Sequence, residues 1–327
     1  MQRVAPAEVV ALRTAVTAAL QGLPAASPVI VACSGGPDSL ALAGAAAWAG
    51  PRAGHPVSAI VVDHGLQEGS AQVAAQAADL CAQLGVTHAA VVRVDVVVRG
   101  GGLEAAAREA RYAALQAEAE AVGASAVLLG HTREDQAETV LLRLARGSGA
   151  RSLSAMRAVN GLWRRPFLDV PRAVVHAGCL AMLPEGAEPW ADPHNDDDAF
   201  ARVRVRRLLA GLGDELGAGV VLGLSRSAEQ LRDDADALDA WAGEVVAELQ
   251  ADANGTWDCA ELARLERAIR TRVLRLLCIA AGAPAEDLSW EHIQSVDALI
   301  VDWHGQGAVA LPGPVAAHRA CGRLSLT

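Results

Sequence analysis

The residue types needed to hold phosphate groups occur together in one six-residue turn: Ser34, Gly35, Gly36, Pro37, Asp38 and Ser39. The turn follows a short β-branched run, 29–33, and precedes a stretch of helical composition. Two glycines let the backbone approach a ligand closely, and their N–H groups, with a helix N-terminus behind them, suit phosphate oxygens. Two glycines alone would indicate only a strand–turn–helix corner, but the full turn favours phosphate binding.

Asp38 is unsuited to direct phosphate contact, because like charges repel. Its presence in the turn is explained if Mg²⁺ lies between its carboxylate and the phosphates. The turn lacks the Gly-Lys-Ser/Thr ending of a Walker A loop, and the chain contains no lysine. Transfer of a γ-phosphoryl group, as in kinases and GTPases, is therefore disfavoured.

A second polar group, from Gly130 to Arg143, follows another apolar run, 126–129. Asp135 could complete a Mg²⁺ site with Asp38, and His131 could contact a phosphate or position an incoming amine. Asp135 could also cap the helix that begins beside it. The sequence leaves both roles of Asp135 open.

These motifs need a scaffold that brings strand ends together, and the first half of the chain predicts one. Apolar runs expected to be strands alternate with helical stretches: strands at 29–33, 57–62, 89–94 and 126–129, and helices at 39–48, 70–84, 103–122 and 135–144. This alternation predicts parallel β-α-β units, and therefore an α/β fold with a doubly wound, mostly parallel sheet. Ligands of such sheets bind beyond the carboxyl ends of the strands, where the polar motifs lie.

The pattern weakens between 145 and 193, and a glycine-rich stretch at 211–223 is the best boundary. We expect a catalytic domain at 1–215 and a smaller, mainly helical C-terminal domain at 216–327. The expected C-terminal elements are helices at 225–250, 258–281 and 289–303 and a hairpin formed by 309–315 and 322–326.

Composition limits the partners and the compartment. The net charge of −10 argues weakly against nucleic acid, yet seven arginines lie between Arg143 and Arg172, and four more lie between Arg202 and Arg207. Charge alone favours solvated helix faces over a basic binding surface. The six cysteines form no CxxC pair, and we find neither an apolar run of membrane-spanning length nor a signal peptide, so a cytoplasmic protein with reduced thiols is expected.

The turn at 34–39 resembles the pyrophosphate loop of the N-type ATP pyrophosphatases (PP-loop superfamily), which split ATP between its α and β phosphates and adenylate a substrate. Gly130–Arg143 resembles the GHxxDDQAETxLLR block of the tRNA(Ile)-lysidine synthase family and its thiolase relatives, with Glu134 in place of the first Asp. Further segments resemble the same family in the same order, over roughly residues 28–210: 62–66, 102–112, 146–149, 165–167 and 190–206. The departures are Gly102 and Val203 where the family has Asn, and His194 where it has Ser.

The resemblance implies an enzyme that ligates free L-lysine to the 2-carbon of the wobble cytidine of an isoleucine tRNA with a CAU anticodon. ATP would adenylate the base, AMP and pyrophosphate would be released, and ATP and Mg²⁺ would be required. A homodimer is one candidate for the oligomeric state, which the sequence leaves open. The C-terminal domain would contact the tRNA.

The resemblance also implies roles for individual residues. The implied catalytic residues are Asp38, His131, Asp135 and Arg111, and Asp38 and Asp135 would hold the metal. Asp63, His64 and Gly130 would join the turn at 34–39 in binding the nucleotide. The implied substrate-binding residues are Glu104, Arg108, Glu138, Arg146, Arg202 and Arg206.

Three other functions remain open at the level of sequence. A tRNA thiolase of the same superfamily would usually use a reactive cysteine or a CxxC-held cluster. An amidotransferase-type synthetase would need a glutaminase segment, for which we see no support. A non-catalytic nucleotide sensor would bind ATP without releasing pyrophosphate.

Overall fold

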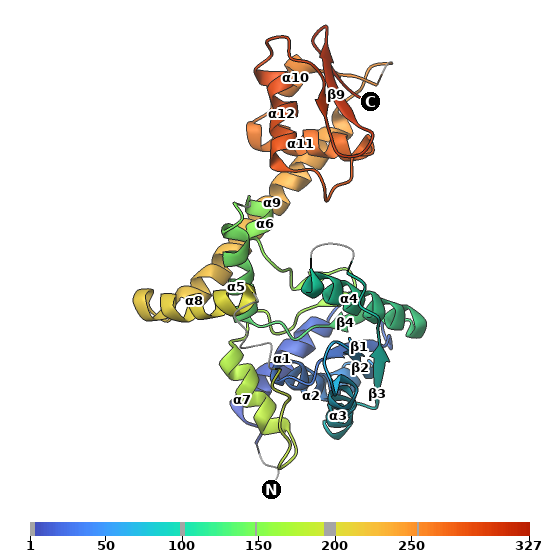
Figure 1. Ribbon diagram of the computed structural model, residues 1–327, viewed down its shortest axis with the longest axis vertical. Coiled ribbons are helices and arrows are strands. Elements are labelled where there is room, and N and C mark those ends of the chain that lie inside the picture. The colour runs from blue at the N-terminus through green and yellow to red at the C-terminus, as the bar shows by residue number, and fades with distance from the viewer. Residues whose placement is uncertain (1–3, 99–101, 148, 193–200, 254) are drawn as a thin grey trace. The chain divides into compact units, whose positions relative to one another are not determined.

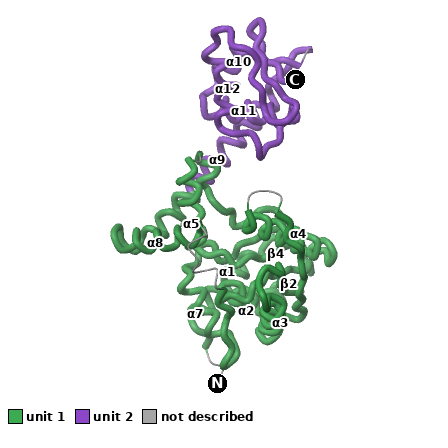
Figure 2. The backbone as a smooth tube through the Cα atoms, viewed as in Figure 1, with its two compact units in different colours: residues 1–229 green, residues 230–327 purple. Residues whose placement is uncertain are grey.

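The computed structural model describes residues 4–98, 102–147, 149–192, 201–253 and 255–327. The chain forms two compact units, 1–229 and 230–327, which join within helix α9 (Val220–Glu248) (Figure 2). The domain boundary expected at 215/216 stays a prediction. His194 of the family element at 190–206 lies outside the described residues.

Unit 1 contains a six-stranded sheet with the order β3-β2-β1-β4-β6-β5 (Figure 1). The strands are β1 (Val29–Cys33), β2 (Val57–Asp63), β3 (His88–Arg93), β4 (Ala126–Leu128), β5 (Val159–Asn160) and β6 (Trp163–Arg164). Every neighbouring pair is parallel except β5 and β6. The predicted doubly wound, mostly parallel sheet is therefore confirmed, while β5 and β6 were not predicted, because two-residue strands carry no periodicity.

Both faces of the sheet are covered by helices, as the apolar strands require (Figure 1). Val29, Val31 and Cys33 of β1 belong to a core that includes side chains of the helices on one face: α1 (Ala7–Leu20), α2 (Pro37–Arg52), α3 (Ser70–Gln83) and α7 (Arg172–Met182). Ile30 lies in a separate core with Leu115 of α4 (Leu103–Val122) on the other face. This division follows from the alternation of side chains along a strand.

The order in which the strands are added to the sheet determines where on the sheet a ligand can bind. After β1, helices α2 and α3 cover one face while β2 and β3 extend the sheet in one direction. Helix α4 then crosses the opposite face and delivers β4 to the other side of β1. The chain continues from β1 toward β2 and from β4 toward β5 and β6, in opposite directions along the sheet. Ligands of doubly wound sheets bind between two such connections.

Local sequence explains where the two helices at this point begin. Pro37 is the first residue of α2, where a proline costs no hydrogen bond and its fixed φ suits the helix. α5 (Arg133–Leu144) begins with a capping box between Thr132 and Asp135. The remaining helices of this unit are α6 (Ala150–Leu153) and α8 (Ala201–Leu216).

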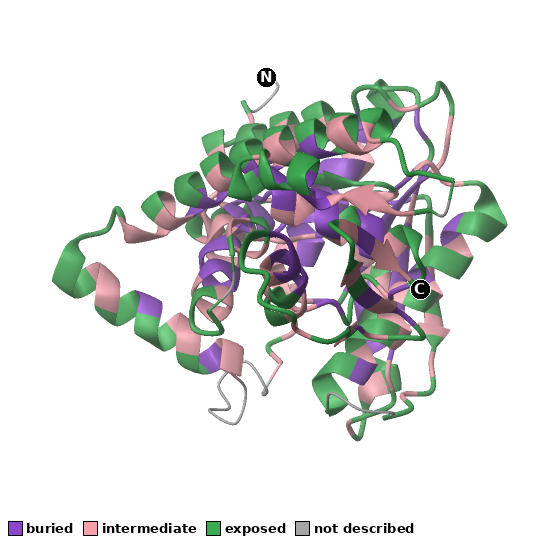
Figure 3. Ribbon diagram, turned by 90° about the horizontal axis from the view of Figure 1, so that it is seen from above, coloured by how far each residue is buried: buried purple, intermediate pink, exposed green. Residues whose placement is uncertain are grey.

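Unit 2 contains the C-terminal half of α9, three shorter helices and an antiparallel sheet ordered β7-β10-β9-β8. The helices are α10 (Cys259–Ala263), α11 (Arg267–Ala280) and α12 (Trp290–Val301), and the strands are β7 (Trp257–Asp258), β8 (Val309–Ala310), β9 (Ala316–Ala320) and β10 (Arg323–Leu326). The side chains of α10, α11, α12 and this sheet share one core. In both units the buried residues line the interior of the packed elements (Figure 3).

Two sequence predictions for unit 2 are wrong. The single helix expected at 258–281 is divided into α10 and α11, because Glu266 has a non-helical ψ of 140°, and the residues around it carry no sequence signal for this break. The hairpin joins β9 to β10 through Cys321 and Gly322, which both have positive φ, and β8 pairs with β9 instead of β10.

Among the described residues, no single helix has the length and apolarity needed to cross a membrane, although α8 and α9 pass that test when taken together.

Candidate active site

The turn after β1 can be made only with glycine at position 35. Gly35 has a φ of +82°, and a Cβ there would lie 3.0 Å from the Cβ of Ala77. Any other residue would be both strained and crowded. The Gly35 carbonyl accepts a hydrogen bond from the N–H of Trp190 at 2.9 Å, so the segment before residue 193 is attached to this turn.

The two serines of the turn have different surroundings. Ser39 is buried, its Oγ accepts from the N–H of Ser34 at 3.1 Å, and it donates to the Gly36 carbonyl at 3.0 Å. These bonds hold the turn in shape. Ser34 is exposed, and its Oγ lies 3.3 Å from Oγ of Ser39, so its hydroxyl is accessible to a ligand at the edge of this network.

The end of β4 lies directly against this turn. A Cβ on Gly130 would be 3.0 Å from the carbonyl oxygen of Asp38 and 3.3 Å from the N of Ser39. The absence of a side chain at Gly130 therefore allows the two backbones to touch. The structure brings the two polar motifs of the sequence together at one point.

Asp38 provides a carboxylate oxygen that suits a cation. Its Oδ1 is buried and lies 3.2 Å from Nε2 of His176, which forms an ion pair with it when protonated. Burial raises the pKa of Asp38 to about 6, and the nearby Asp135 acts in the same direction, while Arg172 and His176 oppose them. A carboxylate with this one neighbour on Oδ1 keeps lone pairs that could face a cation.

The residues around Asp38 could bind Mg²⁺ only together with the phosphates of a bound nucleotide. No group of three His, Cys, Asp or Glu side chains within the described part of the chain could hold a metal by itself. Mg²⁺ is commonly bound through one or two carboxylates together with substrate phosphates and water. Asp38, which belongs to the turn at 34–39 (the phosphate turn), offers that arrangement.

Asp135 is committed to two structural contacts. Its Oδ2 accepts from the N–H of Thr132 at 2.7 Å and from the Thr132 hydroxyl at 2.9 Å, and its Oδ1 accepts from Arg172 at 2.9 Å. Burial disfavours its charge, but Arg172 and the Thr132 bonds outweigh this and lower its pKa. The capping role is therefore observed, and the metal role stays a prediction.

Arg172, at the start of α7, links several of the predicted acids. Its guanidinium lies 3.3 Å from Oε1 of Glu138, and its backbone N–H donates to Oε2 of Glu134 at 2.8 Å. Glu138 is almost fully buried and also accepts from Nε of Arg206 on α8 at 3.1 Å. Sequence reasoning missed the roles of Arg172 and His176, whose one signal was that they lie four residues apart on one helix.

His131 follows β4 and is neutral at physiological pH. Burial lowers its pKa to about 3, Arg165, Arg111 and Arg108 add to this effect, and Asp135 opposes it. Its Nδ1 is buried and has no hydrogen-bond partner. A neutral imidazole with a free nitrogen can donate or accept a hydrogen bond without adding charge.

Arg111 on α4 contributes a positive charge near His64, Arg108 and Arg202. Its Nε has no hydrogen-bond partner, and its pKa is lowered by burial and by the charges of Arg108 and Arg202. His64 lies near Arg111, and burial and that charge lower the pKa of His64. Guanidinium groups held near one another in this way suit a polyanion.

The aromatic ring of Tyr112 organises Arg108. The Arg108 guanidinium lies 4.7 Å from the centre of that ring and donates to the Tyr112 hydroxyl at 3.2 Å, while Trp163 packs against the ring with 4.6 Å between centroids. Arg108 is thus held on α4 at a defined position.

The remaining predicted site residues have other surroundings. Asp63 is buried and accepts from the N–H of Gly65 at 2.9 Å, so it shapes the turn after β2. Glu104 and Arg146 are exposed. Their predicted substrate contacts stay predictions.

Comparison with known proteins agrees with this geometry. Residues 10–212 match the PP-loop domain, and residues 258–325 match the TilS substrate binding domain. A U34-tRNA thiolase from Methanococcus maripaludis has the same fold, with a TM-score of 0.55 and 17% identity over 69% of this chain and 80% of that one. That likeness concerns the fold alone.

Two curated relatives are much more similar in sequence. A tRNA(Ile)-lysidine synthase of Thermobifida fusca is 55% identical over 98% of this chain and 97% of its own length. One of Streptomyces coelicolor is 52% identical over 93% of this chain and 86% of its own length. These identities over most of each chain show that this chain belongs to the tRNA(Ile)-lysidine synthase family.

Proposed function

We propose that this protein ligates lysine to the 2-carbon of the wobble cytidine of an isoleucine tRNA, at the expense of ATP. The observation that carries the proposal is the contact between the phosphate turn, 34–39, and Gly130 at the end of β4. This contact supports the proposal, because a backbone suited to phosphate would then lie beside groups that could bind an amine. The names of the curated relatives support the same reaction.

The chain would bind ATP with its phosphates on the turn and its leaving pyrophosphate beside Asp38. Asp38 would hold Mg²⁺ together with phosphate oxygens, and Asp135 is the proposed second ligand. When bound, the metal would neutralise charge that develops on pyrophosphate. The cytidine 2-oxygen would attack the α-phosphorus, and the bond to pyrophosphate would break.

In the second step the ε-amine of lysine attacks the activated ring carbon and AMP leaves. The amine must arrive uncharged, and the proton that it loses as the C–N bond forms would pass to the phosphate of the departing AMP or to water. His131 is neutral and has an unpartnered Nδ1, so it can accept a hydrogen bond from the amine without repelling its ammonium form. Glu104, Glu134, Asp135 and Glu138 are proposed to attract that ammonium.

The arginines near the site are proposed to contact tRNA phosphates. Arg111 lies within electrostatic range of Arg108 and Arg202. Binding through such groups would weaken steeply with salt. The anticodon base must leave its stack to reach the turn. A CAU anticodon, a cytoplasmic location and a homodimer belong to the same proposal.

The deciding experiment supplies the protein with tRNA(Ile), ATP, Mg²⁺ and labelled lysine. We expect label in the anticodon base and one pyrophosphate per lysine incorporated. Asp38→Asn should abolish both products, while Asp79→Asn, at an exposed position on α3, should leave both unchanged. ATP binding without pyrophosphate would instead identify a sensor, and wild-type pyrophosphate release by Asp38→Asn would remove the metal role.

A further inference from the structure

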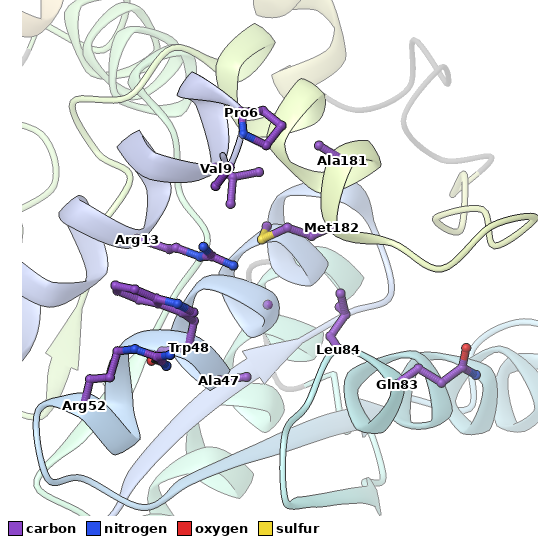
Figure 4. Close-up of a pocket in the computed structure, with 12 residues that line it drawn as sticks. Pro6, Val9, Arg13, Ala47, Trp48, Arg52, Gln83, Leu84, Ala181 and Met182 are labelled. Carbon is purple, nitrogen blue, oxygen red and sulfur yellow. Dashed lines mark hydrogen bonds between the residues drawn. The ribbon is translucent and has the colours of Figure 1, made fainter. Parts of the chain in front are cut away.

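A pocket of about 450 Å³ opens among helices α1, α2, α3 and α7 (Figure 4). Its lining from α2 comes from the second half of that helix, Gly44 to Arg52, whereas the phosphate turn lies before the first residue of α2. The volume falls within the range that holds a small organic molecule. The pocket is therefore separate from the site proposed for ATP.

The charged part of the pocket consists of two guanidinium groups around one indole. Arg13 lies 4.8 Å and Arg52 lies 4.3 Å from the centre of the Trp48 ring, one on each side of it (Figure 4). Arg52 also donates to the carbonyl of Trp48 at 2.8 Å. Stacking and this bond hold both groups in place before any ligand arrives.

The two charges are not compensated within the pocket. None of its lining residues is acidic, and no ion pair of Arg13 or Arg52 occurs in the part of the chain that the structure describes. The Nε of Arg13 is buried without a hydrogen-bond partner, and burial and the charge of Arg52 lower the pKa of Arg13. Two guanidinium groups in one pocket without a carboxylate favour an anion that reaches either of them beside the Trp48 ring.

Apart from Gln83, the rest of the lining is apolar and would accommodate an apolar part of the ligand. Val9, Leu84 and Met182 contribute it, and Gly44 packs closely against the last two, because a Cβ there would lie 3.2 Å from the sulfur of Met182 and 3.3 Å from Leu84. A zwitterion such as free lysine would find no carboxylate for its ammonium groups here. We propose that this pocket binds a small organic anion, a carboxylate or phosphate monoester on a short apolar chain.

Calorimetric titration of the full chain, with ATP present to fill the phosphate turn, tests this proposal. The probes are hexyl phosphate and hexanoate, with hexanol lacking the charge. We expect at least one anion to saturate a single site, with an affinity at least about tenfold weaker in Arg13→Gln/Arg52→Gln, because charge-assisted bonds are lost. The stronger anion identifies the head group.

A matched double variant, Arg226→Gln/Arg264→Gln, removes the same charge from exposed positions elsewhere and should bind as the wild type does. The single variant Arg52→Gln, at an exposed position, repeats the test if the double variant at the pocket does not fold. The proposal is overturned by no saturable binding, by equal binding in both double variants, or by hexanol binding as tightly as the anions.

Discussion

Replacing Gly130 with alanine tests the contact on which the proposed reaction depends. The new Cβ would meet the carbonyl oxygen of Asp38 at 3.0 Å and its carbon at 3.1 Å, and both atoms belong to the backbone. Backbone in the first turn of a helix cannot move aside as a flexible side chain can. Overpacking of this kind costs about 1–3 kcal/mol of unfolding free energy.

The same clash would displace Asp38 and the phosphate turn. Misplacement by about 1 Å can reduce a reaction about a hundredfold, so pyrophosphate release should fall by about that factor. Chemical denaturation and a pyrophosphate assay measure the two effects. Gly243→Ala is the control, because it lies in α9 with open space around its Cβ and should be neutral or slightly stabilising. Unchanged stability and release in Gly130→Ala would refute the contact.

Two further predictions concern buried charge. The pKa of Asp38 is raised to about 6 in the fold, so the folded state holds more protons than the unfolded state between about pH 4 and 6, and stability from this group is lost as pH rises through that range. The free energy of unfolding of metal-free Asp38→Asn should therefore exceed that of the wild type by about 1–3 kcal/mol at pH 8, and the two should be similar at pH 4. Denaturant titrations measure both values, and an equal difference at both pH values would contradict this. Arg172→Met should cost about 3 kcal/mol, because the nearly buried Glu138 loses one of its two arginine partners. Arg93→Met, which removes an exposed group 3.8 Å from Asp63, should cost less than about 1 kcal/mol, and equal losses in the two variants would refute the distinction.

Where prediction from sequence succeeded, the cause lay within a few residues. The strand before the turn, the glycines of the turn and the helix after it are neighbours in the chain. The capping of α5 by Asp135 likewise depends on residues three apart. Such structure follows from backbone and side-chain geometry that a short window contains.

Prediction failed where distant packing selects between local conformations of similar energy. The residues between α10 and α11 favour a helix locally, but in the fold the chain leaves the helix at Glu266, whose ψ is 140°. The predicted pairing of 309–315 with 322–326 was wrong, because the strand β9 was not recognised between β8 and β10.

The sequence alone determined the alternation that builds a parallel sheet, the turn that can hold phosphate and the family resemblance, because each is written in the order and spacing of neighbouring residues. Only the tertiary structure decided that Gly130 touches the backbone of Asp38, and that Glu138 has partners 34 and 68 residues away in Arg172 and Arg206. It also placed two arginines around Trp48 in a separate pocket. The sequence names a carboxylate in the same way whether it faces a metal, a lysine or an arginine. Its charge and its free lone pairs depend on its neighbours in space, and packing decides which neighbours those are.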